Sequence, residues 1–221
     1  MKKKINLGIL VSGNGTNLQS IIDNIEKGLL DAVIKVVISN NPDAYALERA
    51  KKHKIPSVVI EQKKYRGRGN FDHKMIDILK ADSVDLVVMA GFMRILSSSF
   101  LAAFPMRIMN IHPSLLPSFP GLNVQKKAVQ YGVKFSGCTV HFVDEDVDTG
   151  PIIVQAIVPV YADDTEDTLA HRILREEHKI YPQAIQFYAE GRIVVKGRIV
   201  HINGISQAPM QSLHNPPLMM F

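Results

Sequence analysis

The first hundred residues alternate short apolar segments with amphipathic ones, and this alternation limits the possible folds more than any other feature. Four apolar runs have the length and composition of buried strands, at residues 5–11, 32–40, 56–60 and 84–91. The intervals between them have helical periodicity, at residues 13–28, 42–54 and 71–82. Strands that alternate with helices indicate a parallel sheet with right-handed crossovers. We therefore expect an α/β fold with a Rossmann-like, mostly parallel sheet and helices on both faces.

The second half of the chain follows a different pattern. A fifth strand and a short helix precede two strands that are joined by the acidic loop DEDVDTG, at residues 106–112, 123–132, 136–143 and 151–160. This spacing predicts that antiparallel strands extend the sheet. A long helix then covers residues 164–191, in which Pro182 is expected to cause a kink or a break, and residues 192–202 resemble a hairpin.

The composition limits the cell compartment and the classes of binding partner that we expect for the chain. The net charge of +5 is a weak indication of nucleic-acid binding, but the basic residues are scattered apart from MKKK and KKYRGR, neither cluster is interleaved with stacking aromatics, and there is no tryptophan. A small anionic substrate fits this charge equally well. The single cysteine, Cys138, fits a reducing compartment and is expected to be a small buried strand residue. No stretch approaches the roughly 18 apolar residues that span a membrane, and the N-terminal apolar run is expected to be a strand rather than a signal peptide. We expect a cytoplasmic protein without membrane contact.

The turn SGNGTN at residues 12–17 leaves a strand and opens a helix. Backbone N–H groups at such a helix start favour an anion, and glycine allows close approach. The turn has neither the third glycine of a dinucleotide fingerprint nor a Walker lysine. It indicates a phosphate on a smaller molecule, although an ordinary turn between strand and helix has the same sequence character.

Asn110 and His112 stand at the end of the fifth strand. Residues i and i+2 of a strand point to one face, so the two side chains converge. An asparagine amide can donate to a developing oxyanion, and histidine can exchange a proton near neutral pH. A histidine satisfied by a loop edge is the alternative. The three prolines that follow, at positions 113, 117 and 120, predict a stiff loop, with a cis bond expected at Leu116–Pro117.

The acidic segment DEDVDTGP, residues 144–151, is the third candidate. Asp148 precedes Thr-Gly-Pro, where the loop must turn into the next strand, and a carboxylate there could orient His112 and favour its protonated form. A solvated turn is the common alternative. The segment lacks the glutamate that an EF-hand loop has at its twelfth position, so no metal site is expected.

Five segments together resemble the phosphoribosylglycinamide formyltransferase family, the folate-dependent enzymes of purine biosynthesis: GNGTNL, AGFMRIL, NIHPSLLPSFPG, VHFVDEDVDTGPII and EEHKIYP. The resemblance covers residues 4–202. HPSLLP and D-x-G-P recur across folate-dependent formyl-transfer enzymes, whereas the N-terminal turn and EEHKIYP are specific to the glycinamide ribonucleotide enzymes. The resemblance implies formyl transfer from 10-formyltetrahydrofolate to the amine of 5'-phosphoribosylglycinamide in IMP synthesis, without a metal, by a monomer or a homodimer.

The resemblance also implies a division of the chain. Residues 1–205 would form one formyltransferase domain, with a Rossmann-like phosphate-substrate half at 1–105 and a catalytic and folate half at 106–205. The segment 206–221 loses periodicity and gains proline, so it is expected to be a flexible tail.

Site residues follow from matching positions. The family's catalytic residues fall on Asn110, His112 and Asp148. Its phosphate turn and ribose contact fall on Gly15, Thr16, Asn17 and Glu177. Its folate-binding positions fall on Arg68, Met93, Arg94, Ile95, Leu96, Asn110, Asp144, Glu145, Asp146 and Val147. Many relatives have a histidine after PSFPGL, but this chain has Asn123, so the resemblance implies no role for that position.

Three other functions remain as alternatives. A methionyl-tRNA formyltransferase is expected to have an RNA-binding domain after residue 202. A formyltetrahydrofolate hydrolase is expected to have a regulatory domain before Ile5. A non-enzymatic binding module would not require Asn110, His112 and Asp148 to converge, so the distance between Asp148 and His112 distinguishes it from an enzyme.

Overall fold

The computed structural model describes residues 4–65, 68–205 and 213–215. Within them, nine strands form one sheet: β1 Ile5–Val11, β2 Ala32–Ser39, β3 Ser57–Val59, β4 Leu86–Met89, β5 Ile108–His112, β6 Phe135–Phe142, β7 Ile152–Pro159, β8 Ile193–Lys196 and β9 Ile199–Ile202. The α-helices are α1 Thr16–Glu26, α2 Tyr45–Lys52, α3 Arg68–Ala81, α4 Ser98–Ala103, α5 Val124–Tyr131 and α6 Glu166–Ala189, with a short 3-10 helix at Gln62–Lys64.

The strand order is β3-β2-β1-β4-β5-β6-β7-β9-β8. Strands β1 to β5 run parallel, as the alternation of strands and helices requires. β6 and β7 pair antiparallel after β5, and β8 and β9 form the expected hairpin, which joins β7 through a single pairing of Ile152 with Ile199. The expected fold class, a mostly parallel sheet with an antiparallel extension, is confirmed.

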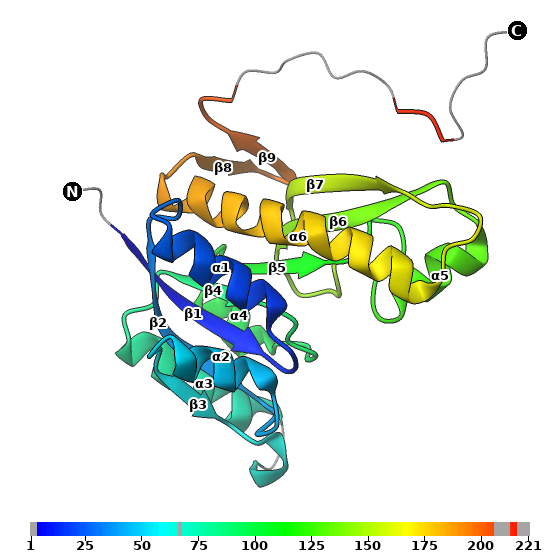
Figure 1. Cartoon of the computed structure of the whole chain (residues 1–221). Coiled ribbons are helices and arrows are strands. Elements are labelled where there is room, and N and C mark those ends of the chain that lie inside the picture. The colour runs from blue at the N-terminus through cyan, green and yellow to red at the C-terminus, as the bar shows by residue number, and fades with distance from the viewer. Residues whose placement is uncertain (1–3, 66–67, 206–212, 216–221) are drawn as a thin grey trace, which may run out of the picture.

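Helices cover both faces of the sheet (Figure 1). Buried side chains of α1, α2, α5 and α6 pack on one face, and those of α3 and α4 pack on the other. Strand alternation sorts the residues between these two cores: in β1, Ile9 and Val11 enter the first core and Leu10 enters the second. In β5, Met109 and Ile111 face α6, so Asn110 and His112 point to the opposite face.

The helix α6 runs through Pro182 without a break, so of the two expected effects, a kink or a break, the break is wrong. Proline has no N–H, and the carbonyl four residues earlier therefore loses its helical partner. That carbonyl belongs to His178, and the hydroxyl of Ser20 in α1 donates to it at 2.7 Å. A tertiary contact thus supplies the hydrogen bond that the helix lacks.

The loop after β5 is held against β6 and β7. The Leu116–Pro117 bond is cis, as expected. The amide of Leu116 donates to Thr139 Oγ1 at 3.1 Å, and Gln155 Nε2 donates to the carbonyl of Leu116 at 2.9 Å. Side chains of the two neighbouring strands therefore fix the loop that follows His112.

Most of the expected tail lies outside the described residues. Of the three that are described there, Asn215 donates through Nδ2 to the carbonyls of Lys134 and Val160, at 2.7 and 3.0 Å. In the described ranges, no helix combines the length and the apolar character needed to cross a bilayer.

Candidate functional site

The parallel strands deliver their following loops to one edge of the sheet, where α/β folds bind ligands. The turn after β1 and the loop after β4 meet there directly. The amide of Ser12 donates to the carbonyl of Gly91 at 3.1 Å, and the amide of Met93 donates to Ser12 Oγ at 2.9 Å. Met89 of β4 pairs with Asn110 of β5, so the end of β5 lies beside both loops.

His112 and Asp148 are in contact, although 36 positions separate them in the sequence. Nδ1 of His112 lies 3.2 Å from Asp148 Oδ2, and Nε2 lies 2.9 Å from the carbonyl oxygen of Phe119. Both ring nitrogens therefore face acceptors, which favours a ring with a hydrogen on each nitrogen. The ring is 4% exposed, so its contact with the Asp148 carboxylate lies in a site with little water.

The loop between β6 and β7 holds Asp148 in place. Asp148 has a left-handed backbone, with φ 57°, a conformation in which Asp and Asn are enriched. Its Oδ2 also accepts from the amide of Gly121 at 2.9 Å. A Cβ on Gly150 would lie 1.8 Å from the carbonyl oxygen of Phe142, so only glycine permits this close approach of loop and strand.

Asn110 contacts a histidine that sequence reasoning missed. Asn110 pairs with His141 across β5 and β6, and its Nδ2 lies 3.3 Å from His141 Nε2. His141 Nδ1 lies 2.8 Å from the carbonyl of Phe142, and Nε2 lies 3.7 Å from Asp148 Oδ1. Burial lowers the pKa of His141. The sequence did place His141 in an alternating strand pattern just before the acidic loop. The strand register that puts it opposite Asn110, however, is fixed by the tertiary structure and cannot be derived from the sequence pattern.

The turn after β1 brings Asn17 to Glu177 of α6. Gly15 caps α1 with φ 73°, and a Cβ there would lie 2.6 Å from Ala46 Cβ. Asn17 Nδ2 donates to Glu177 Oε2 at 2.7 Å, whereas Asn17 Oδ1 is buried and has no hydrogen-bond partner. Burial raises the pKa of Glu177, and the hydrogen bond from Asn17 opposes that shift. The pair thus combines an unsatisfied acceptor with a nearly buried carboxyl group, a combination suited to hydroxyl groups of a ligand.

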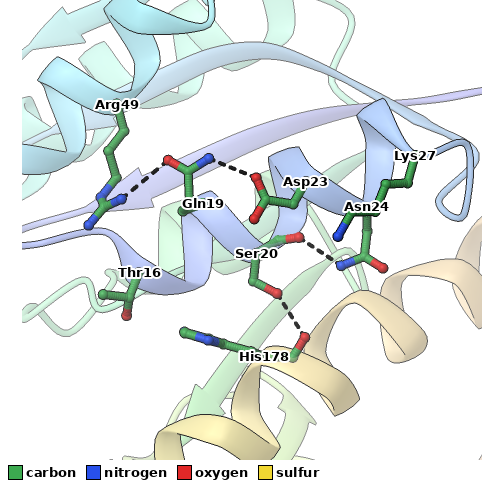
Figure 2. A pocket seen from close by; sticks show the side chains of 8 residues that line it. All are labelled: Thr16, Gln19, Ser20, Asp23, Asn24, Lys27, Arg49 and His178. Carbon is green, nitrogen blue, oxygen red and sulfur yellow. Dashed lines mark hydrogen bonds between the residues drawn. The ribbon is translucent and has the colours of Figure 1, made fainter.

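A pocket of about 360 Å³ lies beside this turn, with walls from α1, α2 and α6 (Figure 2). Thr16 lines it, as do Arg49 of α2 and His178 of α6. Arg49 also donates to Asn14 Oδ1 at 2.8 Å and to the Asn14 carbonyl at 2.9 Å, so its positive charge lies at the turn. This charge adds to the attraction of the helix start for an anion.

The expected folate positions fall on two loops. Met93 and Ile95 are exposed and Leu96 is buried. The Arg94 guanidinium stacks 4.9 Å from the ring centre of Phe71, and its Nε is buried without a hydrogen-bond partner.

In the acidic loop, Asp144 Oδ1 accepts from the Thr149 hydroxyl at 2.6 Å. Glu145, Asp146 and Val147 of that loop are exposed. Arg68 begins α3, but its side chain lies outside the described residues. Over the part of the chain that the structure describes, no group of three or more His, Cys, Asp or Glu residues could hold a metal ion.

This arrangement can stabilise a developing oxyanion and transfer a proton. An amide and an imidazole share one strand end, a carboxylate stabilises charge on the imidazole, and an anion-attracting turn lies at the same sheet edge. The contact between His112 and Asp148 disfavours a binding module without catalysis, which would not require it.

Comparison with known proteins gives a consistent result. Residues 5–185 match the formyl transferase family. The chain is 43% identical over 204 residues to phosphoribosylglycinamide formyltransferase of Haemophilus influenzae, covering 92% of this chain and 95% of that protein. It is similar to the crystal structure of glycinamide ribonucleotide transformylase 1 from Symbiobacterium toebii, with a TM-score of 0.90, 50% identity, and coverage of 91% and 95% of the two chains.

Some relatives are much longer. The trifunctional purine biosynthetic protein adenosine-3 of Drosophila melanogaster is 46% identical over 200 residues, which are 90% of this chain. The chain spans only 15% of the length of that protein.

Proposed function

The chain belongs to the phosphoribosylglycinamide formyltransferase family, and from this premise we propose that it transfers the formyl group of 10-formyltetrahydrofolate to the amine of 5'-phosphoribosylglycinamide. The observation that carries the proposal is the buried contact of His112 with Asp148, 3.2 Å long, on the strand that also presents Asn110. Residues 1–205 act as one formyltransferase domain in this proposal, because a single sheet joins both halves.

The reaction proceeds by direct attack. The neutral amine attacks the formyl carbon, a C–N bond forms, and the formyl oxygen becomes the oxyanion of a tetrahedral intermediate. Asn110 Nδ2–H and His112 Nε2–H stabilise that oxygen. His112 Nδ1–H remains with Asp148, which keeps the imidazolium charge in place. The carbonyl of Phe119 now accepts from Nε2, so the oxyanion must share or replace this acceptor.

Collapse of the intermediate needs a proton transfer. The bond from the formyl carbon to N10 of the folate breaks, the attacking nitrogen loses a proton and N10 gains one. His112 or an ordered water carries that proton. Holding the two substrates side by side supplies a further part of the rate enhancement.

The phosphoribosyl group binds at the turn after β1. Backbone N–H groups at residues 15–17 and the positive charge of Arg49 attract the phosphate. Glu177 accepts from a ribose hydroxyl, and Asn17 Oδ1 gains the partner that it lacks in the protein alone.

The folate lies along the loops that follow β4 and β6. The exposed apolar side chains of Met93, Ile95 and Val147 suit a flat, partly apolar ring system. The buried Nε of Arg94 has no hydrogen-bond partner in the protein alone and can donate to a polar group of the folate. The bound folate supplies the activated formyl group, and the residues of the two loops orient the folate.

A direct assay tests the proposal. Purified protein is incubated with 10-formyltetrahydrofolate alone, with 5'-phosphoribosylglycinamide, or with methionyl-tRNA, and formylated product and free formate are both measured. We expect formyl transfer only with 5'-phosphoribosylglycinamide. Formate release without an acceptor would identify a hydrolase, formylated methionyl-tRNA would identify the tRNA enzyme, and no turnover in any arm would favour a binding module.

A further inference from the structure

The neighbours of His141 favour one tautomer of its neutral ring. Nδ1 faces the carbonyl oxygen of Phe142 at 2.8 Å, so Nδ1 must carry a hydrogen. In the neutral ring Nε2 then has a lone pair, and it faces Asn110 Nδ2 at 3.3 Å. A lone pair can accept from the nitrogen of the Asn110 amide but would repel its oxygen. The neutral ring therefore selects one of the two amide orientations of Asn110.

Several groups around His141 influence its charge. From β5, Asn110 and His112 face the ring, and from the acidic loop Asp144 and Asp148 do so; the partner residue in β7 is the apolar Ile152. The two carboxylates favour a charged ring, whereas His112 and the burial of the ring, which is 2% exposed, oppose it. Burial is the largest influence and lowers the pKa of His141, which favours the neutral ring that can accept from Asn110 Nδ2.

We propose that neutral His141 is the positioning residue of Asn110, an inference that rests on the proposed formyl transfer. One Nδ2 hydrogen of Asn110 is donated to His141 Nε2, which leaves the other for the oxyanion. Without this acceptor the amide could rotate by half a turn and present its oxygen to the developing negative charge. His141 thus acts through Asn110 and does not itself touch the reacting atoms.

Protonation of His141 would undo this arrangement in two ways. A hydrogen on Nε2 repels the amide N–H of Asn110 and attracts the amide oxygen instead. It also attracts Asp148 Oδ1, now 3.7 Å away, and so competes with His112 for the same carboxylate. The protonated ring disables both donors to the oxyanion, and turnover should be lost as His141 takes up a proton.

Two substitutions of His141 test whether the hydrogen-bond acceptor that it offers to Asn110, rather than the imidazole ring itself, is required. Glutamine can place an oxygen near the position of Nε2 and does not titrate, whereas leucine removes the acceptor. We expect His141→Leu to lower kcat about tenfold, less than the 10²–10³ typical of deleting an oxyanion donor, with both KM values within about twofold. His141→Gln should recover most of that loss, and its kcat should fall less on acidification below the ordinary histidine pKa of 6.5. His171→Leu, at an exposed position of α6, is the matched control and should behave as wild type.

A double variant tests whether the effect passes through Asn110. In an Asn110→Ala background, His141→Leu should cause no further loss of kcat, because there is no amide left to orient. Equal losses in both backgrounds, or a glutamine variant that folds normally but is as slow as the leucine variant, would overturn the proposal.

A spectroscopic measurement keeps the inference separate from the proposed function. In ¹⁵N NMR of the intact protein at neutral pH, His141 should show the Nδ1–H tautomer, and the side-chain amide signal of Asn110 should move in His141→Leu. A protein that failed to formylate 5'-phosphoribosylglycinamide would still show these signals, and the failure would then concern the reaction alone. An Nε2–H tautomer would contradict the positioning role whatever the activity.

Discussion

Both ring nitrogens of His112 have a protein partner, whereas beside Glu177 the oxygen of the Asn17 amide has none. The two clusters lie at the same edge of the sheet, yet one is completed by the protein and the other is left incomplete. An unsatisfied buried polar group costs about 1–3 kcal/mol, and a ligand that satisfies it recovers this free energy. Under the proposed function, this difference corresponds to a His112 cluster that is preorganised for chemistry and an Asn17 cluster that its substrate completes.

The largest effect is expected from Asp148→Asn. Asparagine tolerates the left-handed backbone of this position, at φ 57°, but removes the charge that stabilises the His112 imidazolium. We expect kcat to fall about 10²–10³-fold, as when an oxyanion-stabilising group is lost, with the KM for 5'-phosphoribosylglycinamide within about twofold. Steady-state kinetics measure both values.

Asp163→Asn, an exposed carboxylate, is the control for loss of charge alone and should leave turnover unchanged. Near-normal turnover in Asp148→Asn would remove the catalytic role of Asp148. It would also remove the contrast between the two clusters.

Gly150→Ala tests whether the loop itself is part of the preorganisation. Its Cβ would lie 1.8 Å from the carbonyl oxygen of Phe142, the acceptor of His141 Nδ1. The loop or the strand must shift, so we expect a loss of about 2 kcal/mol in the free energy of unfolding together with a lower kcat. Gly69→Ala, where an added Cβ meets no atom within 4 Å, should lower neither. A fully active, fully stable Gly150→Ala variant would show that the loop tolerates displacement.

Sequence reasoning succeeded where a local period decides the structure. The alternation of strands and helices predicted the sheet, and the strand period of two placed Asn110 and His112 on one face. It failed where a distant residue decides. The break expected at Pro182 does not occur, and Ser20 of another helix donates to the His178 carbonyl that the proline leaves without a helical partner. His141 escaped notice because the register of β5 with β6 places it beside Asn110. The contact of Asp148 with His112 was suggested by the position of Asp148 before Thr-Gly-Pro and by the family resemblance, but the loop geometry that produces it cannot be derived from spacing.

Asn17→Ala tests the binding cluster. The substitution removes the unsatisfied oxygen and the hydrogen bond to Glu177, which is 2.7 Å long. We expect the KM for 5'-phosphoribosylglycinamide to rise about tenfold, the equivalent of one hydrogen bond of about 1.4 kcal/mol, with little change in kcat. An unchanged KM would mean that the turn is only structural and that both clusters are self-contained.

Glu177→Gln should give the smallest effect, and it tests most directly whether the cluster of Asn17 and Glu177 is incomplete without a ligand. Burial raises the pKa of Glu177 above the ordinary value of 4.5. Between 4.5 and the raised value the folded protein therefore binds more protons than the unfolded chain, and stability falls as pH rises through this window.

Glutamine at position 177 cannot ionise and can still accept a hydrogen bond from Asn17. We expect the variant to be more stable than wild type above this window, by about 1 kcal/mol or less, and equally stable at pH values below 4.5. Its KM for 5'-phosphoribosylglycinamide should rise. Thermal unfolding at a series of pH values measures the difference between the two proteins, and a difference independent of pH would show that Glu177 does not carry the cost. A cluster that is completed by its ligand requires this carboxylate at the binding position, even though the carboxylate lowers the stability of the fold.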